Sequence, residues 1–139
     1  MITPRYLLDT NICIHIRQQR PADILRRFQS LRPGEAVISV ITYGELRYGA
    51  EKSQNRERAL ALLDDLVTLI PAQPLPALAG IAYGEIRRDL ERRGLVIGNN
   101  DLWIAAHGRS AGVTLVTNND REFRRVSGLQ VENWAGPDA

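Results

Sequence analysis

Short runs of apolar residues, separated by segments with helical periodicity, constrain the fold of this chain most strongly. The run Tyr6-Leu7-Leu8 ends at an acid, Asp9, and the run Ala36-Val37-Ile38-Ser39 follows a Pro33-Gly34 turn. Strands that are apolar along their whole length are typical of parallel sheets buried on both faces. Further strands are expected at residues 68–71, 113–117 and 129–132.

The segments between these runs carry apolar residues at helical spacing. In the segment 55–67, Leu62, Leu63 and Leu66 recur on one helical face, and the segment 76–93 repeats the pattern with Ile86 and Leu90. Other helices are expected at residues 12–18, 21–31, 40–50 and 101–110. Thr10 or Asn11 is expected to cap the first of these, and Asn99 or Asn100 the last.

This alternation of strands and helices predicts an α/β domain whose parallel sheet is covered by helices on both faces. The length of 139 residues suits a single domain, 1–139, with a core from about residue 5 to residue 134. Ligands of such folds bind at the carboxyl ends of the strands. Functional residues are therefore expected directly after the apolar runs.

Composition excludes several other classes of protein. No apolar run is long enough for a membrane span, and the N-terminus lacks the pattern of a signal peptide. The single cysteine, Cys13, has no partner for an internal disulfide, which favours a cytoplasmic location. The net charge is only +2, although the cations are seventeen arginines and one lysine. We attribute the overall arginine excess to genomic base composition.

Four acids stand where core formation alone would not place them. Asp9 and Asp120 follow predicted strands, Glu45 lies beyond the second strand, and Asp101 begins an apolar helix. Carboxylates gathered at one sheet edge repel one another unless a cation lies between them, and carboxylate oxygens suit Mg²⁺ or Mn²⁺. A cation of this kind activates water for attack on a phosphodiester.

Each acid also has a purely structural interpretation. Asp101 is a favourable charge at a helix N-terminus, and Asp9 is a common residue in a turn after a strand. Asn118-Asn119-Asp120 also reads as a turn, and Glu45 would then be a solvated side chain. The four acids together favour a metal site over these separate readings.

Five motifs occur in an order that resembles the PIN-domain ribonucleases of the VapC toxin family. They are Leu7-Leu8-Asp9-Thr10-Asn11, Ile41-Thr42-Tyr43-Gly44-Glu45-Leu46-Arg47-Tyr48-Gly49, Ile97-Gly98-Asn99-Asn100-Asp101-Leu102-Trp103-Ile104-Ala105-Ala106, Leu115-Val116-Thr117-Asn118-Asn119 and Val131-Glu132-Asn133-Trp134. The resemblance extends from about residue 6 to residue 134. It implies a three-layer fold with about five mostly parallel strands, a Mg²⁺- or Mn²⁺-dependent endoribonuclease activity, a homodimer and a VapB-type antitoxin as partner.

The resemblance also implies roles for individual residues. Asp9, Glu45 and Asp101 match the three main acidic metal ligands of the family. The position of a frequent fourth acid holds Asn119, with Asp120 beside it, and both remain candidate ligands. Supporting positions near the site are matched by Thr10, Asn11 and Thr117. The motif from Ile97 to His107 is most similar to that of VapC enzymes that cut initiator tRNA.

Some arginines are placed where they could contact RNA. Arg121, Arg124 and Arg125 follow the loop that bears the candidate site, and Arg47 stands two residues after Glu45. The cluster Arg87-Arg88 and Arg92-Arg93 lies among acids and is interpreted as a solvated helix face.

The main alternative is a PIN fold that binds RNA or a partner without cutting it. The replacement of an acid by Asn119 favours that alternative, whereas three intact acids oppose it. A receiver domain would need a lysine after a late strand, and the only lysine is Lys52. A dinucleotide-binding domain would need a Gly-x-Gly-x-x-Gly motif after the first strand, which this chain lacks.

Overall fold

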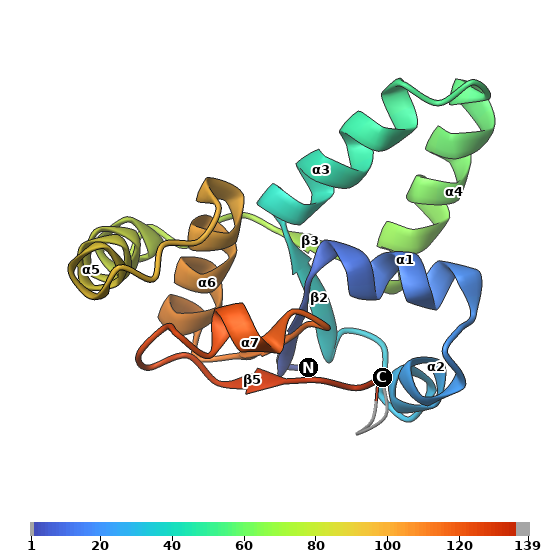
Figure 1. Ribbon diagram of the computed structural model, residues 1–139. Helices are drawn as coiled ribbons and strands as arrows, with labels where there is room; N and C mark the ends of the chain where they lie inside the picture. Colours follow the sequence, from blue (N-terminus) through green and yellow to red (C-terminus); the bar gives the residue numbers. More distant parts are fainter. Residues whose placement is uncertain (1, 136–139) are drawn as a thin grey trace.

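Five parallel strands form the centre of the computed structural model, which describes residues 2–135 (Figure 1). Their order across the sheet is β3-β2-β1-β4-β5, and every neighbouring pair is parallel. The strands are β1 (Tyr6–Leu8), β2 (Ala36–Ser39), β3 (Ala72–Gln73), β4 (Thr114–Val116) and β5 (Val131–Glu132). The predicted parallel sheet of an α/β fold is confirmed.

Seven helices surround this sheet within the described residues. They are α1 (Thr10–Gln18), α2 (Ala22–Gln29), α3 (Val40–Glu51), α4 (Arg56–Leu69), α5 (Ala79–Arg93), α6 (Asn99–Ala111) and α7 (Asp120–Phe123). Helices α5 and α6 lie on one side of the sheet, and α1, α2 and α4 lie on the other (Figure 1). No helix of the described part is long and apolar enough to cross a membrane.

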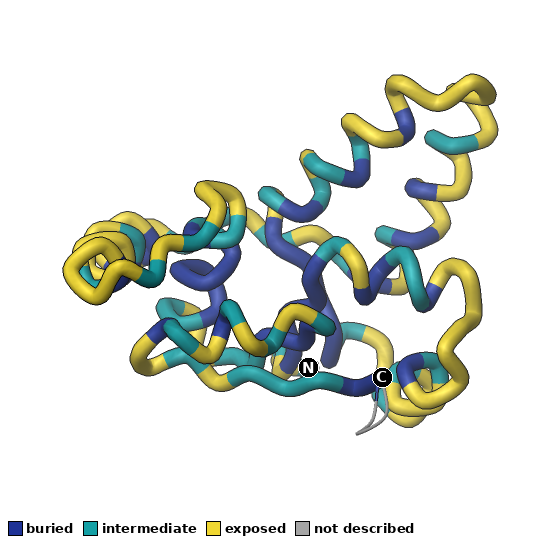
Figure 2. The backbone as a smooth tube through the Cα atoms, in the orientation of Figure 1, coloured by how far each residue is buried: buried dark blue, intermediate teal, exposed yellow. Residues whose placement is uncertain are grey.

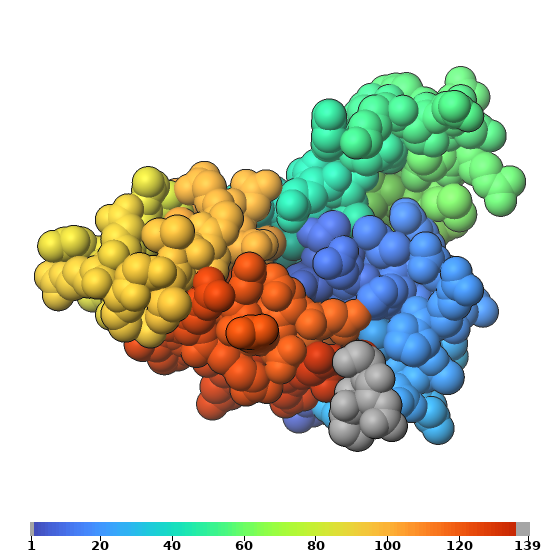
Figure 3. Space-filling model, viewed as in Figure 1, coloured from blue at the N-terminus to red at the C-terminus, as the bar shows by residue number. Residues whose placement is uncertain are grey.

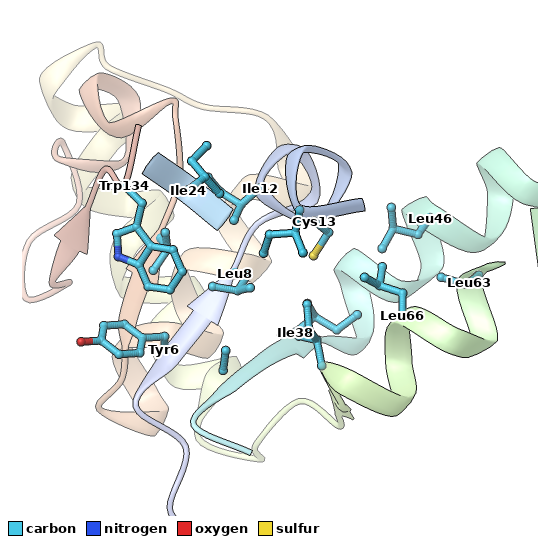
Figure 4. Packing of buried hydrophobic residues seen from close by; sticks show 14 of the residues in the cluster. Tyr6, Leu8, Ile12, Cys13, Ile24, Ile38, Leu46, Leu63, Leu66 and Trp134 are labelled. Atoms are coloured by element: carbon cyan, nitrogen blue, oxygen red, sulfur yellow. The ribbon is translucent and has the colours of Figure 1, made fainter. Parts of the chain in front are cut away.

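The strands bury alternate side chains in two separate cores. Leu8 and Ile38 pack with α1 and α4, as Figure 4 shows from close by, whereas Leu7 and Val37 pack with α5 and α6. This alternation follows from the period of two in a strand. Because both faces are covered, β1 and β2 are buried along their whole length (Figure 2), whereas the edge strands β3 and β5 are not. The sheet thereby becomes a rigid base for residues at its edge.

Helices α3 and α4 form an arm that projects away from the rest of the molecule (Figures 1 and 3). Helix α3 starts at the end of β2, where Ser39 caps it by accepting a hydrogen bond from the Ile41 N–H at 3.1 Å. Helix α4 returns along α3 to the sheet. The base of the arm therefore adjoins the carboxyl edge of the sheet.

Two local predictions were wrong, and one short helix was missed. The segment 68–71 is not a strand, because α4 continues to Leu69 with Leu66 and Ile70 buried at helical spacing, and β3 begins only after Pro71. Helix α7 was not predicted at all. The caps also differ, since Asp9 caps α1 and Gly98 precedes α6.

Candidate metal centre

Asp9 lies at the carboxyl end of β1 and is buried. One carboxylate oxygen accepts the N–H of Ile12 at 3.0 Å, which fixes the first turn of α1. The other oxygen accepts the hydroxyl of Thr117. Burial raises the pKa of Asp9, although these two hydrogen bonds act in the opposite direction. A cation nearby would stabilise the charged form of this buried carboxylate.

Thr117 connects Asp9 to the loop that follows β4. Its buried hydroxyl oxygen accepts the N–H of Asn119 at 2.8 Å while its hydrogen goes to Asp9. The ends of two neighbouring strands, β1 and β4, are thus linked through one side chain. The support of the site by Thr117, which the resemblance implied, has a physical basis in this bridge.

Glu45 projects from the second turn of α3 and is partly buried. The hydroxyl of Thr10, at the start of α1, donates to one of its carboxylate oxygens at 2.8 Å. Thr10 therefore orients Glu45 from a helix that begins beside Asp9. Asn11 is exposed, and its side chain makes no hydrogen bond within residues 2–135.

Asp101 lies in the first turn of α6 and is partly buried. Burial, and then the negative charges of Glu45, Glu122 and Asp9, raise its pKa to about 6. This mutual influence indicates that the acids of β1, α3 and α6 share one electrostatic region. The structure thus gathers residues that lie 92 positions apart in the chain.

This donor set fits a hard divalent cation in its chemistry. The donors are carboxylate oxygens, and their mutual repulsion is the condition that a bound cation relieves. Across residues 2–135, no three acid, histidine or cysteine side chains close into a complete metal-ligand group. Asp9 and Glu45 instead accept hydrogen bonds from protein donors.

Glu122 is an acid near the site that the sequence analysis missed. Its charge raises the pKa of Asp101, and its carboxylate accepts the side-chain N–H of Asn119 at 2.7 Å. The only available clue was its spacing of three residues from Asn119, which brings two side chains together only on a helical turn. Because no helix was predicted at residues 120–123, the spacing gave no reason to place Glu122 near Asn119.

The carboxylate of Asp120 bonds residues outside the group of Asp9, Glu45 and Asp101. Its carboxylate accepts Arg124 Nε at 3.2 Å and the side-chain N–H of Asn133 at 3.3 Å. These partners tie α7 to the segment after β5. Asn119 is exposed at the start of α7, and its side-chain N–H already bonds Glu122.

The four candidate RNA-binding arginines differ in their surroundings. Arg47 donates to Glu51 at 2.7 Å, and Arg124 donates to Asp120. Arg125 donates to the carbonyl of Val96 at 3.4 Å. Arg121 is exposed and forms no ion pair with any described residue.

Comparison with known proteins places this geometry in a family. Residues 6–129 match the PIN domain. The chain is 46% identical over 133 residues to Ribonuclease VapC2 of Haemophilus influenzae, with 94% of this chain and 98% of that protein covered. The chain belongs to the VapC family of PIN-domain ribonucleases. The family resemblance predicted from the five motifs is confirmed.

Other VapC proteins are similarly close. A tRNA(fMet)-specific endonuclease VapC of Shigella flexneri is 46% identical over 131 residues, covering 94% of this chain and 98% of the relative. The solved structure of VapBC-1 from nontypeable Haemophilus influenzae superposes with a TM-score of 0.88 at 38% identity, covering 97% of this chain and 100% of the other. The PIN-like three-layer fold is therefore confirmed.

Proposed function

We propose that this VapC-family chain is the toxin of a toxin–antitoxin pair and acts as a metal-dependent endoribonuclease. The observation that supports this most is the shared electrostatic region of Asp9, Glu45 and Asp101 at the carboxyl edge of the sheet. Carboxylates in such a place weaken the fold unless they serve a bound cation. The family membership supplies the reaction class.

Asp9, Glu45 and Asp101 would hold the ion, which we assign as Mg²⁺ or Mn²⁺ because the donors are oxygens only. When bound, such an ion activates water and neutralises charge on a scissile phosphodiester. One of the three carboxylates accepts the proton that the attacking water loses. Thr117 and Thr10 keep Asp9 and Glu45 in place through their hydroxyls.

The residues around Asn119 decide whether the site has negative charge beyond that of Asp9, Glu45 and Asp101. Its amide brings no charge, so we do not expect it to replace a carboxylate in strength. Glu122, which bonds Asn119 and acts on Asp101, supplies the additional negative charge on that side. We leave Asp120 outside the site because Arg124 and Asn133 already occupy its carboxylate.

We propose tRNA as the substrate, with initiator tRNA as the specific target. The support is the similarity to relatives named tRNA(fMet)-specific endonuclease VapC, at 46% identity in Shigella flexneri and 41% in Salmonella typhimurium. A single free thiol, Cys13, and a tRNA substrate both agree with a cytoplasmic location.

We propose a VapB-type antitoxin as protein partner and a homodimer as the basic assembly. Solved structures of relatives at 38–40% identity are VapBC complexes. The homodimer is supported by apolar side chains that remain exposed at the start of α5, since Leu78, just before the helix, and Ile81 are each 62% exposed. Apolar patches of this kind are typical of protein interfaces.

The test is incubation of the purified chain, freed of antitoxin, with total tRNA and Mg²⁺ or Mn²⁺. We expect one tRNA species to be cut at one position, as mapped by sequencing of the new 5′ ends, and a chelator to abolish the cut. If Mn²⁺ binds, as measured by calorimetry, and no RNA is cut, the chain is a non-catalytic binding module instead.

A further inference from the structure

Two arginine clusters that lie about thirty residues apart in the sequence meet on one surface. Nη2 of Arg93, the last residue of α5, donates to the carbonyl of Arg125, just after α7. Arg125 in turn donates to the carbonyl of Val96, in the loop between α5 and α6. With the exposed neighbour Arg92, these residues define the α5–α7 basic surface: Arg92, Arg93 and Arg125.

The charges of this surface are not fully neutralised by protein carboxylates. Arg93 bonds Asp89 through Nε at 3.1 Å and through Nη2 at 2.5 Å, which leaves its Nη1 without an acceptor among the described residues. Neither Arg92 nor Arg125 forms an ion pair within residues 2–135. Arg109, by contrast, pairs with Glu85.

The guanidinium groups of Arg93 and Arg125 are also held in place. Arg125 is only partly exposed, and both side chains are anchored on backbone carbonyls. An arginine that is already ordered loses less conformational entropy when it binds a ligand than a free surface arginine does. Ordered guanidinium groups with unused N–H donors are suited to phosphate oxygens.

This surface is joined to the elements that carry two acids of the candidate region, Asp101 and Glu122. Val96 stands five residues before Asp101 in the loop that enters α6. Glu122, three residues before Arg125, acts on the charge of Asp101. The arginines are thus bonded to the loop that leads into the helix of Asp101, and Arg125 lies one helical turn from Glu122.

We infer that the α5–α7 basic surface binds backbone phosphates of the RNA substrate on one side of the scissile bond. This inference rests on the proposed endoribonuclease function. RNA is favoured over an acidic protein because the surface continues toward carboxylates, which would repel an acidic chain but accept a phosphodiester together with a cation.

The experiment measures binding of an initiator tRNA transcript in chelator, where no cleavage occurs, over a range of salt concentrations. The variant Arg92→Gln/Arg93→Gln/Arg125→Gln is compared with a control of equal charge change, Arg20→Gln/Arg26→Gln/Arg58→Gln. The control arginines are all exposed: Arg20 lies between α1 and α2, Arg26 on α2 and Arg58 on α4. Arg26 pairs with Asp23 much as Arg93 pairs with Asp89.

We expect the α5–α7 variant to raise the Kd about tenfold and to reduce the slope of log Kd against log salt by about 2, since each lost phosphate contact removes roughly 0.7–0.9. The control should change both quantities much less. Equal effects in the two variants would overturn the inference, because the surface would then contribute only net charge. Binding of polyglutamate, a model acidic polypeptide, is measured in parallel. If the α5–α7 variant loses binding to polyglutamate but keeps its affinity for tRNA, the inference is overturned as well.

The single variant Arg92→Gln is tested in case the triple variant misfolds. We expect it to fold normally, because the Arg92 side chain makes no hydrogen bond within the described residues. It should reduce the salt slope by about 0.8, and an unchanged slope would count against the inference. Cleavage by the wild-type chain with Mn²⁺ is measured in parallel. If the wild type does not cleave tRNA, the proposed function is refuted. If the wild type cleaves tRNA and the variants bind it with the wild-type Kd and salt slope, only the inference about the surface is refuted.

Discussion

At the residue scale, the candidate site is a place where the fold tolerates unfavourable charge. Asp101 has its pKa raised to about 6 by burial and by the charges of Glu45, Glu122 and Asp9. Burial raises the pKa of Asp9 in the same direction. Groups of this kind destabilise a folded chain in order to serve a ligand. The function of these acids can therefore be tested through stability as well as through activity.

We expect Asp101→Asn to stabilise the metal-free protein at pH 7.5. The folded-state pKa lies above the value of 3.8 for an unperturbed Asp, so the folded state loses stability as the pH rises from about 4 to above 6. After allowance for solvent screening, removal of the charge should contribute about 1 kcal/mol, or about 3 °C in Tm. The gain should vanish below pH 4, where Asp101 is protonated in both states.

The control for this prediction is the same melting experiment with Mn²⁺ added. Binding to the folded state should raise the Tm of the wild type and leave that of Asp101→Asn nearly unchanged. A variant that melts lower than the wild type in chelator at pH 7.5 would show that Asp101 has a structural role instead.

Thr117 allows a second test, because one hydroxyl bridges Asp9 and Asn119. Thr117→Val keeps the shape of the side chain but removes both hydrogen bonds, so we expect RNA cleavage to fall about 10- to 100-fold. Thr117→Ser retains the hydroxyl and should keep most of the activity. Single-turnover cleavage rates measure this difference, and equal rates for the two variants would remove Thr117 from the site.

At the scale of helices and strands, the sequence predicted what local periodicity determines. The apolar runs at β1, β2 and β4 were assigned correctly because strands buried on both faces cannot be polar. Strand β3 was misplaced because its two residues carry no pattern of their own and are fixed by pairing with β2. Helix α7, only four residues long, is likewise defined by tertiary contacts.

The contact between α5 and α6 shows how one element positions another. Tyr83 stacks on Trp103 with ring centroids 3.9 Å apart, and its hydroxyl donates to Asn99, the first residue of α6, at 2.5 Å. Asp101 lies two residues farther along that helix. Side chains of α5 therefore fix the start of the helix that carries a proposed metal ligand.

We expect Tyr83→Phe to keep the stack and lose both hydrogen bonds of the hydroxyl, to Asn99 and from Arg87. Its free energy of unfolding should stay within about 1 kcal/mol of the wild type, while its affinity for Mn²⁺ should fall severalfold as Asp101 loses its fixed position. Tyr83→Ala removes the stack as well and should cost about 2 kcal/mol, since the ring is only partly buried. Chemical denaturation and calorimetry measure both quantities. Unchanged Mn²⁺ affinity in Tyr83→Phe would exclude this positioning role.

At the scale of the whole molecule, the strand order brings together acids that lie far apart in the sequence. Parallel strands in the order β3-β2-β1-β4-β5 bring the ends of β1 and β2 to one edge, where Asp9 and the helix that carries Glu45 begin. Asp101, in the first turn of α6, is close enough for the charges of both acids to raise its pKa. The sequence predicted a gathering of four acids from strand ends and one helix start, and the family resemblance selected Asp9, Glu45 and Asp101 from them. It could not predict the contribution of Glu122 or the rotation of Asp120 toward Arg124, because both depend on how α7 packs.

The near-zero net charge of the chain conceals a separation between acidic and basic regions. The acids gather at the sheet edge, whereas Arg92, Arg93 and Arg125 meet beside it. Such a separation attracts RNA to the surface and a cation to the site. Arg92, Arg93 and Arg125 are the arginines to which our inference assigns a role in binding RNA.

The most direct test of the account is the single-turnover rate of tRNA cleavage with Mn²⁺ by the wild type, Asp9→Asn and Asp120→Asn, purified identically. We predict that Asp9→Asn lowers the rate by roughly a hundredfold or more, since loss of a metal ligand exceeds the effect of outer contacts. Asp120→Asn should stay within about threefold, because Asp120 bonds Arg124 and Asn133 instead. Full metal-dependent cleavage by Asp9→Asn would contradict the account.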